Sequence, residues 1–163
     1  MDAADARFGG IARLYGTTGL AKLRAAHVAV IGVGGVGSWS AEALARSGIG
    51  RLTLVDLDEV CVTNTNRQIH ALEGSIGRPK VTELTERISR INPDCVLQAR
   101  QEFFTAQTAD AILGNSFDYL IDAIDGLTSF ETWDLMTTSH GRSTRQVRRN
   151  WVRAIASVLD GAS

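Results

Sequence analysis

The stretch HVAVIGVGGVG, residues 27–37, decides the fold of this chain. Its first part is dense in β-branched residues and stops at a glycine, which is typical of a strand buried on both faces. Residues 36–47 then place Ala, Leu and Trp on one side and end at Gly48, which predicts a helix. Because the intervening glycines lack a Cβ atom, the backbone can turn sharply and present its N–H groups to a phosphate at the positive end of that helix. The stretch therefore predicts a strand, a phosphate-binding loop and a helix in succession.

The same alternation of short apolar strands and amphipathic helices continues on both sides of this stretch. Strands are predicted at 27–32, 52–56, 94–100 and 119–124, and helices at 5–14, 20–25, 36–47, 79–92 and 106–113. Residues 58–72 show no clean period and are predicted to form a polar loop with one helical turn. Strict alternation predicts an α/β fold, namely a Rossmann-like parallel sheet with helices on both faces.

Composition narrows the class of protein. With 44% apolar and 21% charged residues among 163, the chain is neither a disordered tail nor a membrane protein. The first ten residues lack a basic flank followed by an apolar segment, so no secretory signal is expected. The net charge of −1 argues against a strong nucleic-acid or membrane field over the whole molecule. We therefore expect a cytoplasmic domain without a membrane partner.

The character of the chain changes near residue 128. Residues 1–128 hold fifteen acidic and twelve basic side chains, whereas residues 129–163 hold three acidic side chains and five arginines. The second segment is rich in Arg, Ser and Thr and shows no strand pattern. It is expected to be a separate tail with one amphipathic helix at 144–159, whose arginines form a solvated face or, alternatively, bind RNA.

The glycine loop and the end of the second strand supply candidate nucleotide-binding residues. Gly32, Gly34, Gly35 and Gly37 satisfy the pattern GxGxxG between a predicted strand and a predicted helix. Asp56 ends the second strand, where a carboxylate can accept hydrogen bonds from ribose hydroxyls. These five residues fit NAD and ATP equally, and Asp56 disfavours the 2′-phosphate of NADP.

Cationic residues after the second strand favour a longer polyphosphate. Arg67 can clamp phosphates bidentately, Lys80 offers a compact charge, and Asn64 offers a neutral hydrogen bond. A dinucleotide, whose phosphates lie on the glycine loop, needs no such cluster. Asp125 follows the fourth strand and is the candidate ligand of Mg²⁺ on the triphosphate, whereas Asp122 is expected to be structural. The chain has no Walker A pattern, so it is not a phosphate-loop NTPase.

These residues together resemble the ubiquitin-activating-enzyme-like superfamily of ThiF, MoeB and HesA. Within that superfamily, the segments 7–16, 56–72 and 91–95 look like the bacterial tRNA threonylcarbamoyladenosine dehydratases. The resemblance covers roughly residues 5–128, the N-terminal half of what that family normally has. It implies that residues 1–128 are an ATP-binding domain of ThiF type.

The resemblance also implies a reaction and a set of roles. Such enzymes use ATP and Mg²⁺ to adenylate a carboxylate, here the threonyl group on adenosine 37 of tRNA, which then closes a ring with loss of water. The glycine loop would cradle the nucleotide, Asp56 would bind the ribose, and Asn64, Arg67 and Lys80 would contact the phosphates. Asp125 would serve Mg²⁺ and the reacting phosphate. The family forms homodimers in which an arginine of the opposite protomer reaches the site, and Arg7 and Arg13 are both candidates.

Three alternatives stay open at the level of sequence. From Gly126 onward the chain departs from the family pattern, as a truncation or frameshift would produce, and this keeps a non-catalytic nucleotide-binding module in view. Activation of a ubiquitin-like sulfur carrier, with a sulfur-transfer partner protein, would use the same nucleotide residues. An NAD-dependent oxidoreductase would use the glycine loop and Asp56 alone. Cys95 is expected in the core, and His27, His70 and His140 are expected to be satisfied structural residues.

Overall fold

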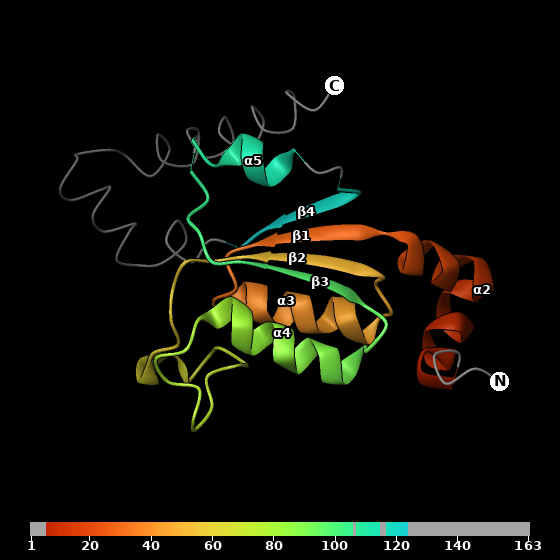
Figure 1. Ribbon diagram of the computed structural model, residues 1–163. Coiled ribbons are helices and arrows are strands. Elements are labelled where there is room, and N and C mark those ends of the chain that lie inside the picture. Colours follow the sequence, from red (N-terminus) through yellow and green to blue (C-terminus); the bar gives the residue numbers. More distant parts are fainter. Residues whose placement is uncertain (1–5, 106, 115–116, 124–163) are drawn as a thin grey trace, which may run out of the picture. The chain divides into compact units, whose positions relative to one another are not determined.

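Four parallel strands form the centre of the protein. The computed structural model describes residues 6–105, 107–114 and 117–123. In the described part, the sheet has the strand order β3-β2-β1-β4 (Figure 1). The strands are β1 (His27–Ile31), β2 (Arg51–Val55), β3 (Val96–Arg100) and β4 (Tyr119–Asp122). All three strand pairings are parallel, which confirms the predicted α/β, Rossmann-like fold.

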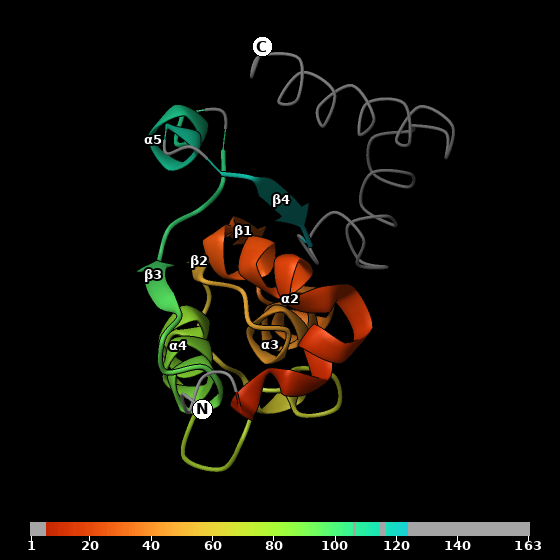
Figure 2. The same ribbon diagram turned by 90° about the vertical axis from the view of Figure 1, so that its right-hand side faces the viewer.

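Helices cover both faces of this sheet, as predicted. In the two views of Figures 1 and 2, α3 and α4 lie against one face and α5 lies on the other. The helical elements are α2 (Gly9–Ala25), α3 (Gly35–Arg46), the 3₁₀ turn η1 (Val62–Asn64), α4 (Lys80–Ile91) and α5 (Ala109–Leu113). Within the described residues, no helix combines the length and the apolar character that crossing a membrane requires.

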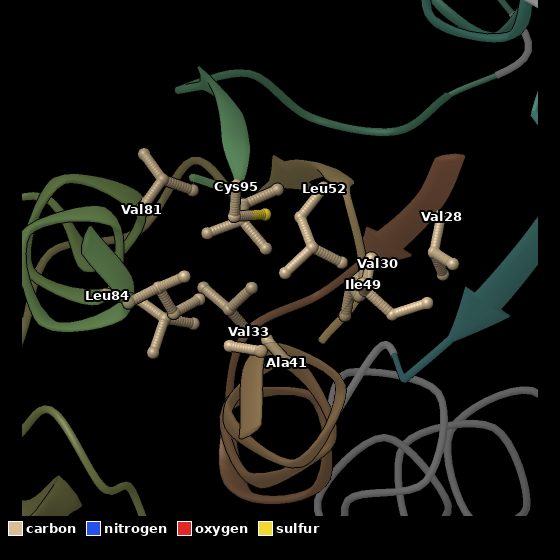
Figure 3. Packing of buried hydrophobic residues seen from close by; sticks show 12 residues of the cluster. Val28, Val30, Val33, Ala41, Ile49, Leu52, Val81, Leu84 and Cys95 are labelled. Carbon is tan, nitrogen blue, oxygen red and sulfur yellow. The ribbon is translucent and has the colours of Figure 1, made fainter. Parts of the chain in front are cut away.

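The main core lies between the sheet and the helices α3 and α4 (Figure 3). Helix α4 contributes Val81, Leu84 and Ile88, whose spacing of three and four residues puts them on one face. A smaller cluster on the opposite face contains Ala29 and Ile31 of β1, packed with residues of β2 and α5. Alternate residues of β1 therefore enter two different clusters, which explains why its sequence is apolar without interruption. Cys95 is buried in the main cluster, as expected.

Two helix boundaries differ from the sequence prediction. The predicted helices 5–14 and 20–25 are joined in α2, which is interrupted by Gly16 with φ 76° and ψ 165°. The glycine breaks the helical path locally, and the helix resumes well before residue 20. Helix α5 begins three residues later than predicted, because Thr108 accepts the N–H of Thr105 and donates to Phe103, which holds this segment in a turn.

Two predicted features lie outside the described residues. They are the tail at 129–163, including the helix at 144–159, and the metal ligand Asp125.

Candidate nucleotide-binding site

The topology brings three loops to one edge of the sheet. Strand β1 lies between β2 and β4, so the chain crosses to opposite sides of β1 at this point. In open parallel sheets, ligands bind outside the carboxyl ends of the strands where the strand order reverses. The glycine loop follows β1, the segment 56–79 follows β2, and Ala123 follows β4. The predicted site residues of the described part all follow β1 or β2 at this edge.

Two positions of the glycine loop require glycine. Gly32 has φ 81°, in the left-handed region that favours glycine. A Cβ atom on Gly37 would lie 1.8 Å from the carbonyl oxygen of Gly32 and 3.2 Å from the Cβ atom of Ala123. Helix α3 begins at Gly35 and has no acidic residue in its first turn, so the helix itself places no carboxylate at its positive end. The loop therefore has the shape and polarity of a phosphate cradle.

Asp56 connects the glycine loop to the loop after β2. Its Oδ2 atom accepts a hydrogen bond from the N–H of Val33 at 2.8 Å, and its Oδ1 atom accepts one from the N–H of Asp58 at 2.9 Å. Burial raises the pKa of this carboxyl above its usual value, against the positive charge of Lys80 and the two N–H donors, which lower it. Each carboxylate oxygen has a second lone pair, which leaves it able to accept from a ribose hydroxyl.

Lys80 is buried beside Asp56 and is paired with a second aspartate. It is 6% exposed, and its Nζ atom lies 2.8 Å from Oδ2 of Asp58, whose side chain is 62% exposed. The backbone fixes this pair as well, because the N–H of Lys80 donates to the carbonyl oxygen of Asp58 and Glu59 forms an isolated bridge with Pro79. The start of α4 is thereby tied to the segment after β2, and the ammonium group is held by a carboxylate that is itself exposed.

Arg67 lies on the loop between η1 and α4 and is exposed to solvent. Its Nη1 atom donates to the carbonyl oxygen of Thr63 at 3.1 Å and to Oδ1 of Asn66 at 3.0 Å. Among the described residues, its Nε and Nη2 atoms have no hydrogen-bond partner, so one edge of the guanidinium fork is open. The carbonyl oxygen of Arg67 accepts a hydrogen bond from Nε1 of Trp39, on α3, at 3.0 Å.

Asn64 has a structural task inside this loop. It is buried, and its Oδ1 atom accepts the N–H of Cys61 at 2.9 Å, which caps the 3₁₀ turn. The carbonyl oxygen of Asn64 accepts the N–H groups of Arg67 and Gln68. Only the Nδ2 group of its side chain is therefore left as a donor toward a ligand.

The arginines of the N-terminal segment do not complete this site within one chain. Arg7 donates from Nη1 to the carbonyl oxygen of Ile91, at the far end of α4 from Lys80. Arg13 is exposed on α2. In the described part of the chain, no group of three or more His, Cys, Asp or Glu side chains is arranged to hold a metal ion.

Sequence reasoning missed two residues that shape the site. Asp58 stands two positions after Asp56, and this spacing was the available signal that a second carboxylate faces the same loop. Trp39 is 56% exposed on α3, whereas the sequence pattern placed it on the apolar side of that helix with Ala and Leu. That placement was wrong, and no sequence signal indicated the contact of Trp39 outside the core.

Comparison with known proteins decides the family. The ThiF family profile matches residues 10–138, which is most of the chain. The chain belongs to the ThiF family. This membership confirms the resemblance to the ThiF, MoeB and HesA superfamily that the glycine loop and the segment 56–72 indicate.

Relatives of this ThiF-family chain include tRNA-modifying enzymes. The tRNA threonylcarbamoyladenosine dehydratase of Haemophilus influenzae is 51% identical over 127 residues, which cover 78% of this chain and 49% of the relative. The Escherichia coli dehydratase TcdA, crystallised in complex with ATP, is 52% identical and has a TM-score of 0.75 over 76% of this chain and 51% of that one. The same enzyme has also been crystallised with AMP, again with a TM-score of 0.75. The chain thus spans about half the length of the curated relatives it matches.

Proposed function

We propose that this chain is the ATP-binding half of a tRNA threonylcarbamoyladenosine dehydratase. The observation that carries this proposal is the pair of cations after β2: Lys80, buried beside Asp56, and Arg67, with one open guanidinium edge. A dinucleotide places its phosphates on the glycine loop and gives these cations nothing to bind, whereas a triphosphate extends beyond that loop. The ATP complex of the 52% identical TcdA supports the choice of ATP.

The residues present fit ATP as a substrate. The glycine loop turns tightly into α3, because Gly37 packs too closely on Gly32 to admit a Cβ atom, and Asp56 retains acceptor capacity for ribose hydroxyls. Lys80 would neutralise charge on the phosphates, Arg67 would hold the terminal phosphates by its open edge, and Asn64 would donate from Nδ2. Their shared task is to position the triphosphate and to stabilise the negative charge that develops when pyrophosphate leaves.

The reaction begins with a carboxylate, which is a poor acyl donor until its oxygen is converted into a better leaving group. A carboxylate oxygen of the threonyl group attacks the α-phosphorus of ATP, the bond to the β-phosphate oxygen breaks, and pyrophosphate departs. Attack within the activated group then closes a ring and releases AMP, so that the net change is ATP-dependent loss of water. This chemistry requires a tRNA that already carries threonylcarbamoyladenosine.

The proposal also includes a magnesium ion, a second copy of the chain and a cellular compartment. Asp125, two positions after Ala123, is proposed to bind Mg²⁺, which would neutralise phosphate charge when bound. Arg7 donates a hydrogen bond to the far end of α4, so it does not reach the nucleotide site of its own chain. We therefore propose a homodimer in which an N-terminal arginine of one protomer reaches the nucleotide of its partner. A tRNA substrate would place the protein in the cytoplasm.

Exchange of labelled pyrophosphate into ATP tests this function on the purified chain. We expect exchange that requires tRNA carrying threonylcarbamoyladenosine, together with binding of ATP but not of NAD. Binding of NAD in the micromolar range without any binding of ATP would contradict the proposal. Binding of ATP without exchange would identify the chain as a nucleotide-binding module that is not catalytic. Exchange that requires a ubiquitin-like sulfur carrier instead of tRNA would identify that carrier as the substrate.

A further inference from the structure

The loop that carries Arg67 is rigid within itself. The carbonyl oxygen of Asn64 accepts the N–H groups of Arg67 and Gln68, and Oδ1 of Asn64 accepts the N–H of Cys61. Asn64 and Gln68 are buried, at 8% and 4% exposure, whereas the residues between them face solvent. The position of the Arg67 guanidinium therefore depends on where this whole turn is placed relative to the glycine loop.

A tryptophan on α3 supplies that placement. The indole Nε1 of Trp39 donates to the carbonyl oxygen of Arg67 at 3.0 Å, across 28 positions of sequence. The neighbouring Ser38 adds a long contact, in which its Oγ atom accepts the N–H of Ile69 at 3.5 Å. Helix α3 begins at Gly35, so Trp39 lies one turn beyond the residues that form the phosphate cradle. The same helix thus holds the cradle at its first turn and the arginine loop at its second.

We propose that Trp39 is a positioning residue. Its hydrogen bond fixes the distance between the backbone of Arg67 and the glycine loop, and this distance allows the guanidinium group to contact the terminal phosphates of ATP. This inference rests on the proposed function and adds to it a residue that touches no substrate. The backbone of Arg67 is the anchored part, while its side chain bends back to Thr63 and Asn66 and keeps Nε and Nη2 open. A displacement of about 1 Å at such a residue is enough to weaken its contact with a ligand.

Substitution Trp39→Phe isolates the hydrogen bond. It keeps an aromatic ring on α3 and removes the N–H donor together with part of the indole, and since Trp39 is 56% exposed and lies outside the buried core, little packing is lost. We expect the affinity for ATP to fall about three- to ten-fold, the range that corresponds to one lost hydrogen bond. The affinity for AMP should stay the same, because AMP lacks the β- and γ-phosphates that Arg67 would hold.

Two further variants separate positioning from a general effect on α3. In an Arg67→Ala background, Trp39→Phe should weaken ATP binding no further, because the residue through which it acts is gone. Ser40→Ala is the matched control: it removes a hydrogen bond from the next residue of α3, which ends on Val36 within the helix, and should leave both affinities unchanged. A second measurement follows the indole N–H of Trp39 by NMR, identified by its absence in Trp39→Phe; it should shift with ATP and not with AMP.

Several results would overturn the inference. Equal losses of ATP and AMP affinity in Trp39→Phe would show damage to the whole site, and unchanged ATP affinity would show that the hydrogen bond positions nothing. Independent, multiplying effects in the double variant would show that Trp39 does not act through Arg67. These outcomes differ from a failure of the proposed function, in which the unsubstituted chain itself does not bind ATP.

Discussion

The contacts of Lys80 indicate a role in ligand binding. The chain has only two lysines, and this one is buried at the start of α4 with its Nζ atom held by Asp58 at 2.8 Å. The partner carboxylate is largely exposed, so the lysine contributes the buried half of the pair and the aspartate the solvated half. Such a pair adds little net stability, because water screens the exposed carboxylate and the cost of burying the ammonium group offsets their attraction. Its geometry instead keeps an ammonium group ready beside the carboxylate of Asp56, where a phosphate can compete for it.

Substitution Lys80→Met tests this assignment at the residue scale. The methionine keeps the buried stem and removes the ammonium group, so we expect ATP binding to weaken by about 1.5–3 kcal/mol, the range for hydrogen bonds to charged groups. Asp58 then stays solvated, and the free energy of unfolding should change by less than about 1 kcal/mol. Isothermal titration with ATP measures the first quantity and denaturant unfolding the second. Lys22→Met, at the exposed lysine of α2, is the control and should change neither.

At the scale of elements, Glu42 links α3 to α4. It is 6% exposed, and its carboxylate accepts hydrogen bonds from Arg46 on its own helix and from Arg87 on α4. The Arg87 hydrogen bond, with help from Arg46, holds the pKa of Glu42 below its ordinary value despite the opposing effect of burial. A group whose pKa is lowered by folding stabilises the fold above its ordinary pKa, here 4.5, and loses that contribution as pH falls through the lowered value.

Glu42→Gln should therefore lower the free energy of unfolding by about 1–3 kcal/mol at pH 7. The difference from the unsubstituted chain should shrink as pH falls below 4.5, because the unfolded chain then takes up a proton at Glu42 while the folded chain still holds the carboxylate ionised. Urea unfolding at several pH values measures both effects. Glu86→Gln on α4, which breaks an exposed pair with Arg78 of the preceding loop, should change stability by about 0–1 kcal/mol only. A loss of equal size at pH 3 and pH 7 would mean that Glu42 acts by packing rather than by charge.

Comparison of individual elements with their sequences explains which parts of the fold the sequence could predict. The strands and the helices α3 and α4 follow from runs or periods of hydrophobic residues, such as Val81, Leu84 and Ile88 of α4, and lie close to where they were expected. Helix α2, in contrast, was expected as two shorter helices. The glycine loop and Asp56 were predictable because they follow directly from a strand end. The contacts of Asp58 with Lys80 and of Trp39 with Arg67 were not, because residues 58–72 show no hydrophobic period and the course of this loop is fixed by single hydrogen bonds. Long-range contacts of a loop leave no repeating pattern in sequence.

For the whole molecule, His70 contributes to how stability responds to mild acid. It was expected to be a satisfied structural histidine, and this was wrong in one respect: it is 2% exposed, but among the described residues neither ring nitrogen has a hydrogen-bond partner. Burial, with the positive charges of Lys80 and Arg87, lowers its pKa from 6.5 to about 4. Between these two values the unfolded chain binds a proton at this residue and the folded chain does not. Stability must therefore fall as pH drops from 6.5 to about 4.

His70→Leu should remove this part of the pH dependence. The leucine leaves no polar atom unpaired and cannot take up a proton in the unfolded state, so between pH 6.5 and about 4 the variant should lose less stability than the unsubstituted chain. One proton corresponds to a slope of at most about 1.4 kcal/mol per pH unit. Denaturant unfolding of both proteins across this window measures the difference, in which contributions from all other titrating groups cancel. Parallel stability curves would mean that His70 takes up its proton as readily in the folded chain as in the unfolded one. The loss of stability in acid would then arise below pH 4.5, from carboxylates such as Glu42.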